Sequence, residues 1–589
     1  MFFIYKNSNL QKSTPFYKEK TEMEEKKLTG YPSIDKPWLK FYQKDTILSD
    51  VPECTVYQNL YNHNKDHLDE IALMYFGKKI TYAQLFIEVE KAAKAFAAQG
   101  VKNGDNVALC VPATPETMYA ILALNKIGAN ANMLNPTFTS QQLTDRINDT
   151  GAELLVVVNE LYSRVENVIP NTCVKTVISF SAVNSLGTIV KIIKKAKNIP
   201  GTIPWNKFIA NAKHNKPVVD APYRKDTPAI MVYSSGTTGA SKGIQLTNDS
   251  VNSTSIEGVQ LGFPWERGDK WFSQVPIWFS TGICASTLVP LTYGITIILE
   301  PMYDFEIFYQ HILKYKPNFM VTACGLLDYL MMKQPKSEAY KEFKFLCAGG
   351  EYVAPSAEKK YNEWLKSNGN KYGLFKGYGM CECGGTVTAS FRCNTVGSAG
   401  IPTPGIVVSA FDPKTNTELT YGQRGEIRVL SKNRMLGYYK NPEATAKYFW
   451  TDEKGNVWCC TGDMGYVDED GCVFVDGRIN DSYINEHGET IYLFDIERAI
   501  LGVESVRQCK AVVSEIDGKQ THVAHAVFFN DKSTEEIISQ IQTVCKTKLP
   551  KNHYPHLIKL HEDALPVSPS GKLNTVAMKQ DTENLIFVE

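Results

Sequence analysis

The sequence predicts an α/β protein in which layered α/β subdomains and a sheet-rich subdomain form one large N-terminal domain, followed by a small mobile α+β lobe. At 589 residues the chain is much longer than one compact core requires. Apolar strand-like runs alternate with helical patterns as far as about residue 410, which is typical of layered α/β folds. Beyond that point, shorter strand-like runs separated by turn residues predict a sheet-rich subdomain.

The first regular elements follow a lead-in of about fifty residues. A helical apolar face begins at Thr81 and ends before Gly100, which stands where a C-terminal cap belongs. The run NVALCVP (106–112) predicts a buried strand, because it is apolar throughout. TPETMYAILALNKIG (114–128) then predicts a capped helix, and AELLVVV (152–158) predicts another strand.

Strand patterns return in the last third of the chain. GEIRVL (425–430) and GCVFVDG (471–477) predict short strands of the sheet-rich subdomain. A new set of elements then begins, which is enough for a separate α/β lobe of roughly 110 residues. These elements are strands at KAVVSE (510–515), THVAHAVFF (521–529) and HLIKL (556–560), and an amphipathic helix at TEEIISQIQTVCKTKL (534–549).

The chain therefore divides into three predicted parts. Residues 1–50 form an N-terminal extension and lead-in, because the charge-rich segment there lacks apolar periodicity. Residues 51–479 form the large domain, and residues 480–589 form the small lobe. We expect the hinge between these two parts at Asn480.

The composition excludes several classes of protein. The 63 basic and 63 acidic side chains balance, which gives no reason to expect binding to nucleic acid or to an anionic membrane. Fourteen cysteines without a C-x-x-C pair favour buried thiols in a reducing compartment. Neither a membrane span nor a signal-peptide pattern is visible, so we expect a cytoplasmic protein.

A loop rich in glycine and hydroxyl groups follows the apolar run PAIMVY (228–233), which predicts a strand. The loop reads SSGTTGASKG (234–243) and offers backbone N–H groups, several hydroxyls and one long cation, Lys242. These groups suit a polyphosphate, although the loop lacks the spacing of a Walker A motif. A flexible serine-glycine linker would share the composition but would not explain the lysine or the strand before it.

Further motifs follow this loop in a fixed order. Together they resemble those of the adenylate-forming superfamily of acyl-CoA synthetases, luciferases and peptide-synthetase adenylation domains, and the chain looks most like a bacterial-type acyl-CoA synthetase. The resemblance covers roughly residues 50–575 and implies the acyl-CoA synthetase-like fold. The motifs are CAGGEYVAP (347–355), GYGMCECGG (377–385), MLGYYKNPEAT (435–445), CTGDMGYVDEDG (460–471), GRIND (477–481) and LPVSPSGKLN (565–574).

The resemblance also implies the roles of individual residues, with ATP, Mg²⁺ and coenzyme A as ligands. Lys572, Thr238, Lys242 and Glu382 would be catalytic, and Glu382 would bind the metal. One carboxylate is sufficient, because Mg²⁺ takes its other ligands from phosphate oxygens and water. Cys381 replaces a threonine of the family and donates only weakly. The implied binding residues are Ser234, Ser235, Gly236, Thr237, Thr238, Gly239, Lys242, Gly349, Gly350, Glu351, Tyr378, Gly379, Met380, Cys381, Asp463 for the ribose, Arg478, and Gly488 for coenzyme A.

The acyl pocket is expected around PIWFSTGI (276–283), where many acyl-CoA synthetases have P-L-x-H. Trp278 and Phe279 would form a neutral aromatic gate, although packing in the core is a nearly equal interpretation of both side chains. A pocket of aromatic and small residues favours an uncharged aliphatic or aromatic acid. The small residues are Gly282, Ala323, Cys324, Gly325 and Gly384.

Three hypotheses on function follow. The first is an AMP-forming carboxylic acid–CoA ligase, in which the carboxylate of the acid attacks the α-phosphorus of ATP and the acyl group then passes to coenzyme A. The second is a stand-alone adenylating enzyme that loads an aryl or amino acid onto a carrier-protein thiol. The third is a non-catalytic ATP-binding descendant of the fold, suggested by Cys381, by an altered hinge segment and by the lack of the arginine that usually follows the last motif.

Overall fold

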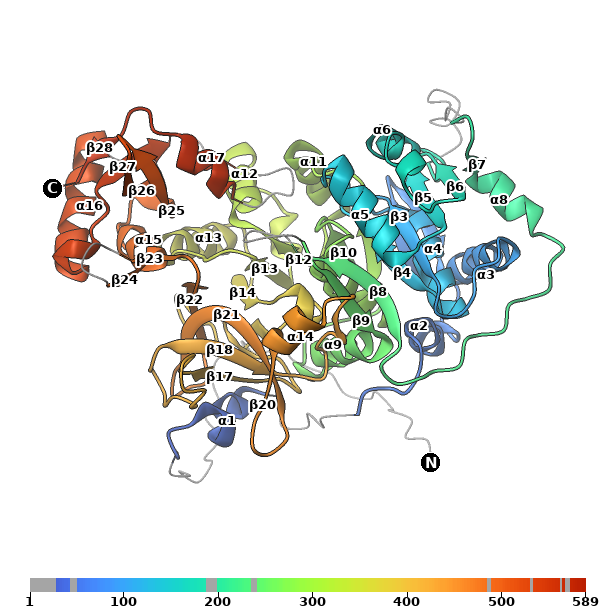
Figure 1. The fold of residues 1–589 in the computed structure, drawn as a ribbon, viewed down its shortest axis with the longest axis horizontal. Coiled ribbons are helices and arrows are strands. Elements are labelled where there is room, and N and C mark those ends of the chain that lie inside the picture. Colours follow the sequence, from blue (N-terminus) through green and yellow to red (C-terminus); the bar gives the residue numbers. More distant parts are fainter. Residues whose placement is uncertain are drawn as a thin grey trace.

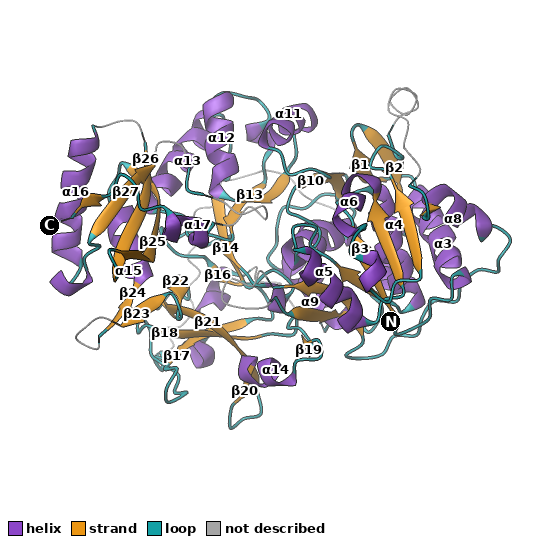
Figure 2. Cartoon of the chain, turned by 45° about the horizontal axis from the view of Figure 1, so that its top comes forward, coloured by secondary structure: helices purple, strands orange, loops and turns teal. Residues whose placement is uncertain are grey.

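The structure is a computed structural model that describes residues 28–42, 50–186, 199–234, 241–484, 489–529, 533–561, 564–566 and 573–588. Three sheets form the larger part of the molecule, and a smaller sheet lies at the end that contains the C-terminus (Figures 1 and 2). The predicted α/β class is therefore confirmed. In the part of the chain that the structure describes, no helix has the length and apolar character needed to cross a bilayer.

An eight-stranded sheet extends from the middle of the molecule to the end opposite the C-terminus (Figure 1). Its central strands are parallel, and the predicted strand at PAIMVY is β8. The strands are, across the sheet, β19 (Gly437–Tyr438), β9 (Gly243–Thr247), β8 (Pro228–Tyr233), β4 (Asn130–Met133), β3 (Asn106–Cys110), β5 (Leu154–Val158), β6 (Thr176–Phe180) and β7 (Ile203–Pro204). The helices of this region are α2 (Val56–Asn64), α3 (Tyr82–Ala98), α4 (Pro115–Ile127), α5 (Ser140–Thr150), α6 (Tyr162–Val165) and α8 (Trp205–Asn211).

The predicted helix ends of this region are present as local contacts. Thr81 caps α3 in a reciprocal capping box with Gln84. Thr114 accepts the backbone N–H of Thr117 at the start of α4, and Gly128 ends this helix in the left-handed region with φ +85°. A Cβ at Gly128 would also lie 2.8 Å from the Cβ of Ala221, so only glycine fits.

A nine-stranded sheet occupies the middle of the molecule. It is parallel from β14 to β1 and carries antiparallel strands at both edges. In order, its strands are β16 (Ile401–Pro402), β15 (Thr388–Ala389), β14 (Leu374–Tyr378), β13 (Phe345–Gly349), β12 (Phe319–Thr322), β10 (Lys270–Ser273), β11 (Thr296–Leu299), β1 (Ile71–Tyr75) and β2 (Lys78–Thr81). The associated helices are α9 (Asn248–Gln260), the π-helix Thr281–Leu288, α10 (Val289–Thr292), α11 (Phe305–Tyr315), α12 (Cys324–Lys333) and α13 (Pro355–Ser367).

The third sheet is antiparallel and corresponds to the predicted sheet-rich subdomain. The predicted strand GEIRVL is β18. The sheet contains β17 (Val407–Phe411), β18 (Gly425–Leu430), β21 (Val457–Val467), β20 (Phe449–Thr451) and β22 (Val473–Arg478), with α14 (Pro442–Tyr448) between β19 and β20 in the chain and the short N-terminal helix α1 (Pro32–Asp35) against β17.

The C-terminal region forms a four-stranded sheet with helices beside it, as the sequence predicts (Figure 1). The long strands β25 and β26 form a hairpin, and β27 lies parallel to β26. The elements are the hairpin β23 (Ser482–Ile484) and β24 (Thr490–Tyr492), then α15 (Leu493–Leu501), β25 (Val506–Ile516), β26 (Lys519–Phe528), α16 (Thr534–Lys548), β27 (Leu557–His561), α17 (Thr575–Gln580) and β28 (Ile586–Phe587).

An ion-pair network joins the third sheet to α15, and we call it the junction network. The buried Asp476 carboxylate on β22 lies 2.6 Å from Arg424 Nε and 2.7 Å from Arg498 Nη1. Arg424 also pairs with Asp495 at 2.9 Å. Burial raises the pKa of Asp476, and the two guanidinium groups act in the opposite direction. Asp476 comes shortly before the exposed Asn480, the predicted hinge, along the chain.

Candidate active site

The neck of the glycine-rich loop is closed by hydrogen bonds between its two ends. The antiparallel strands β8 and β9 bring Ser234 next to Lys242. Lys242 N donates to Ser234 Oγ at 3.0 Å, Ser234 N donates to the Lys242 carbonyl at 3.0 Å, and Ser241 Oγ donates to the Ser234 carbonyl at 2.8 Å. Several predicted site residues lie outside the described residues: Ser235, Gly236, Thr237, Thr238, Gly239, Gly488 and Lys572.

Lys242 and Glu382 are brought together by Tyr438. The exposed Lys242 ammonium lies 4.8 Å from the centroid of the Tyr438 ring, and the Tyr438 hydroxyl donates to Glu382 Oε1 at 2.9 Å. The pairing of β19 with β9 causes this arrangement, since Tyr438 lies opposite Ile244. No role for Tyr438 could be predicted from the sequence, because no local pattern indicates that two short strands so far apart in the chain pair.

The carboxylate of Glu382 suits a hard cation. It lies in a short turn of 3₁₀ helix and is partly exposed, and its main-chain carbonyl is held by Met435 N at 2.7 Å. Glu382 Oε1 is occupied by Tyr438, whereas Oε2 accepts no hydrogen bond from the residues that the structure describes. A partly exposed carboxylate with a fixed backbone is the donor type that Mg²⁺ prefers, so the residues present fit this ion.

A second polar cluster forms where β14 meets the paired strands β21 and β22. Tyr378, the last residue of β14, donates its hydroxyl to Asp463. Arg478 Nε lies 3.0 Å from Asp463 Oδ1, because these two residues are opposite each other on β21 and β22. Burial raises the pKa of Asp463, whose side chain is 6% exposed, and the Arg478 guanidinium opposes this shift. The carboxylate is thus oriented by both neighbours.

Several positions of the candidate site must be glycine, because two backbone segments come very close together there. Gly349 ends β13 opposite Gly377, whose carbonyl oxygen would lie 3.3 Å from a Cβ at Gly349. Gly350 has φ +83°, in the left-handed region. A Cβ at Gly379 would lie 2.2 Å from the Gly385 carbonyl oxygen, which no side chain allows. The Gly-Gly turn and the GYGMCECGG segment therefore meet without side chains between them.

The remaining nucleotide-site candidates lie around these glycines. Met380 Sδ accepts the Tyr448 hydroxyl at 3.1 Å, and Cys381 is partly buried beside it. Glu351 Oε1 accepts the Cys324 N–H at 2.6 Å, so this carboxylate faces the start of α12.

The predicted acyl-pocket residues are divided between two hydrophobic clusters. Trp278 packs against the cluster of the two large sheets, whereas Cys324 belongs to the cluster under α11 and α12. Gly282 lies against Pro276, whose carbonyl oxygen would be 2.1 Å from a Cβ there. The others are Phe279, which is half-buried and tilted at 6.3 Å from the Trp278 ring, Ala323 and Gly325 at the start of α12, and Gly384, which is buried against Thr254.

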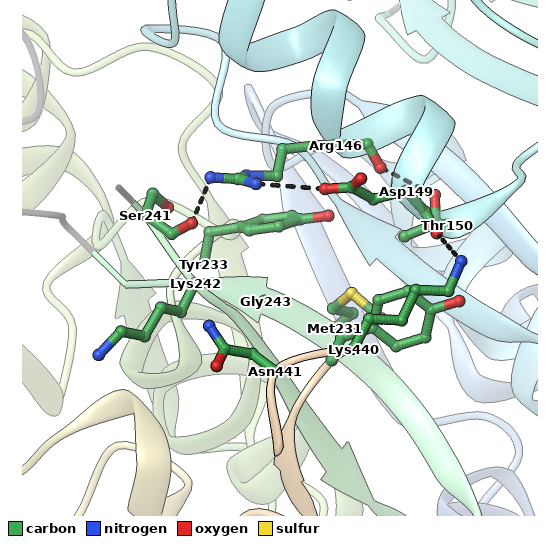
Figure 3. Close-up of a pocket in the computed structure, with 11 residues that line it drawn as sticks. Arg146, Asp149, Thr150, Met231, Tyr233, Ser241, Lys242, Gly243, Lys440 and Asn441 are labelled. Atoms are coloured by element: carbon green, nitrogen blue, oxygen red, sulfur yellow. Dashed lines mark hydrogen bonds and ion pairs between the residues drawn. The ribbon is translucent and has the colours of Figure 1, made fainter. Parts of the chain in front are cut away.

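A cavity of about 360 Å³ lies next to the loop neck (Figure 3). Arg146, on α5, reaches across it and donates to the carbonyl of Ser241. Its guanidinium carbon lies 5.6 Å from the Tyr233 ring centroid, and its Nη1 lies 3.4 Å from Asp149 Oδ2. Lys440 lines the same cavity but donates to the Asp149 carbonyl at 2.6 Å. Arg146 therefore holds the end of the loop, a role that no motif in the sequence predicts.

The arrangement of these sheets around the loop is that of the adenylate-forming enzymes. The structure of ATP-bound MatB from Rhodopseudomonas palustris has a TM-score of 0.75 with 20% identity, over 90% of this chain and 99% of that one. The AMP-binding enzyme family matches residues 60–439, and the chain belongs to this family. The predicted superfamily and the prediction of an enzyme are thereby confirmed.

Two curated relatives are similar over nearly the whole chain. A long-chain-fatty-acid–CoA ligase of Bacillus subtilis is 25% identical over 576 residues, which cover 93% of this chain and 99% of the relative. A 2-succinylbenzoate–CoA ligase of Geobacillus is 27% identical over 517 residues, which cover 86% and 93% respectively. Both names describe acid–thiol ligases, the type of enzyme that the sequence predicts, but the acids differ.

Proposed function

We propose that this protein is an ATP-dependent carboxylic acid–CoA ligase. It would activate an apolar acid, with a fatty acid as the first candidate, as an acyl-adenylate and then form the acyl-CoA thioester. The observation that carries the proposal is the convergence of Lys242 and Glu382 on Tyr438 beside the closed loop neck. The acid–CoA ligases among the relatives support the acceptor, and their different acids leave the choice of acid to experiment.

The proposed first step depends on positioning and charge. The carboxylate nucleophile is already ionised, so little acid–base chemistry is required. Lys242 would neutralise charge on the departing pyrophosphate, Lys572 would bridge the attacking and α-phosphate oxygens, and Asp463 would accept hydrogen bonds from the ribose. When Mg²⁺ is bound at Glu382, it supplies further positive charge to the phosphates.

In the proposed second step, the thiol of coenzyme A must take the place of Lys572 at the acyl-adenylate. An acyl-adenylate is a mixed anhydride that water would hydrolyse, so we propose that the small lobe, residues 480–589, closes over the large domain, residues 51–479. Rotation about Asn480 would then replace Lys572 by a thiol path that includes Gly488. Residues 1–50 would remain an extension without a part in the reaction. We also propose a cytoplasmic location, because fourteen cysteines without a C-x-x-C pair suit a reducing compartment.

Pyrophosphate release across a panel of fatty, aryl and amino acids, with and without coenzyme A, tests the proposal. Continuous release that requires a fatty acid and coenzyme A supports it. Pyrophosphate release that stops after a single turnover, with or without coenzyme A, and becomes continuous when a carrier protein is added would favour the adenylating enzyme that loads a carrier protein. If no acid gives pyrophosphate release although ATP binds, the non-catalytic alternative is favoured.

The first prediction concerns Asp463. Replacement by alanine should raise KM for ATP by about tenfold or more, because a hydrogen bond to a charged group is worth about 1.5–3 kcal/mol. The measurement is initial velocity against ATP concentration. Asp470→Ala removes an exposed carboxylate from the turn after the same strand and should leave KM unchanged. An unchanged ATP dependence in Asp463→Ala would remove this residue from the site.

The second prediction concerns the loop neck. Arg146→Ala should raise KM for ATP by about tenfold, because the Ser241 carbonyl loses its charged donor and the end of the loop is released. Lys440→Ala is the matched control, since Lys440 lines the same cavity without a bond to the loop. Equal effects in the two variants would show that the cavity, rather than the contact with Ser241, matters.

A further inference from the structure

Two histidines and an aspartate come together in the C-terminal sheet, away from the clusters described above. His525 lies on β26 and is fully buried, and His561 ends β27. Asp581 follows α17 directly. One ligand atom of each residue lies within 4.8 Å of the other two, and His525 Nδ1 is 3.0 Å from His561 Nε2.

The register of the parallel strands β26 and β27 explains why the His525 and His561 rings lie on the same face of the sheet. His525 is opposite Lys559, and Val527 is opposite His561. Because side chains on a strand alternate between faces, His525, Lys559 and His561 share one face of the sheet. Met578 of α17 packs with Val527 in one cluster, so α17 covers this face and delivers Asp581 to its edge.

The donor set is that of a three-residue transition-metal site. Imidazole nitrogen and carboxylate oxygen are common zinc ligands, and two histidines with one carboxylate leave a fourth position for water. In a tetrahedral site with Zn–N distances of about 2.1 Å, neighbouring donor atoms are about 3.4 Å apart. The two imidazole nitrogens are already near this separation, and the carboxylate needs a shift of about 1.5 Å at most.

We propose that His525, His561 and Asp581 bind one Zn²⁺ ion that ties together the two ends of the segment between β27 and Asp581. This segment contains Lys572, but the inference does not depend on the proposed activity. Lys559 donates to Asp581 through one carboxylate oxygen and to the Glu583 carbonyl at 3.0 Å. Lys559 thus orients the Asp581 carboxylate and leaves the second oxygen of Asp581 for the metal.

Zinc binding to the full-length, untagged, chelator-treated chain tests this inference. Competition with a chromophoric zinc chelator should show one tight site per chain, and Co²⁺ should give the absorption bands of a tetrahedral ion. His561→Gln and Asp581→Asn, which change partly exposed residues, should weaken zinc binding by about tenfold or more while the far-UV circular dichroism stays unchanged.

The matched control is His556→Gln. His522 and His556 also stack, with centroids 5.4 Å apart, but no third ligand completes that pair in the described part of the chain. His556→Gln should therefore keep the site. In addition, zinc should slow proteolytic cleavage between residues 562 and 580 in the wild type and not in Asp581→Asn.

Failure to compete with the chelator, or affinity unchanged in both His561→Gln and Asp581→Asn, would overturn the inference. The two rings would then share only a hydrogen bond. Loss of pyrophosphate release with zinc binding intact would refute the proposed function alone, so the two failures are distinguishable.

Discussion

Replacement of Lys572 by alanine is expected to lower the rate of adenylate formation by about a hundredfold or more, the usual cost of removing one preorganised electrostatic donor. The second half-reaction, thioester formation from supplied acyl-adenylate and coenzyme A, should continue at its normal rate. The reason is that the proposed reorientation about Asn480 withdraws this lysine before the thiol attacks. The two half-reactions are measured separately, as acid-dependent pyrophosphate release and as acyl-CoA formation.

Lys579→Ala provides the control for this experiment. Lys579 is an exposed lysine of α17, a short distance along the chain, and carries the same charge. Its loss should leave both half-reactions unchanged. If Lys572→Ala slows both half-reactions to the same extent, the scheme of two orientations is wrong for this protein.

Glu382→Gln is expected to have an effect of similar size. The amide can still accept the Tyr438 hydroxyl, so the local contact remains, but the negative charge that would hold Mg²⁺ is lost. Adenylate formation should fall by about a hundredfold, and the Mg²⁺ concentration for half-maximal rate should rise. Rates measured against Mg²⁺ at fixed ATP test this.

Tyr438→Phe tests the hydrogen bond to Glu382 separately from the negative charge of Glu382. Phenylalanine keeps the ring beneath the Lys242 ammonium but removes the hydroxyl that donates to Glu382. We expect a loss of less than about tenfold and a small change in Mg²⁺ dependence, in line with the value of one hydrogen bond to a charged group. Identical magnesium curves for Glu382→Gln and the wild type would exclude Glu382 as the metal ligand.

Local signals allowed much of the fold to be predicted. The strand predicted at PAIMVY matches β8 residue for residue, and GEIRVL matches β18. The helix predicted at 114–128 is α4 with its threonine and glycine caps. Such elements are recognisable because periodicity and capping depend on residues a few positions apart.

The roles of Tyr438 and Arg146 could not be predicted from the sequence, because they depend on tertiary contacts. Tyr438 acts beside Lys242 only because β19 pairs with β9, and Arg146 reaches Ser241 only because α5 lies beside the neck of the loop. Both contacts join segments far apart in the chain, and no local pattern encodes them. The acyl pocket stays a prediction, and its residues Trp278 and Cys324 pack in different hydrophobic clusters.

The junction network has a consequence for the proposed rotation. If α15 moved away as proposed, Arg498 would leave Asp476, but Arg424, which directly precedes β18 of the same sheet as Asp476, could stay. The buried carboxylate thus keeps a counter-ion throughout, and the several kcal/mol that an abandoned interior charge would cost are avoided. Because these charges are buried or partly buried, salt screens them less than it screens exposed pairs, so the orientation in which α15 contacts the third sheet should persist as ionic strength rises.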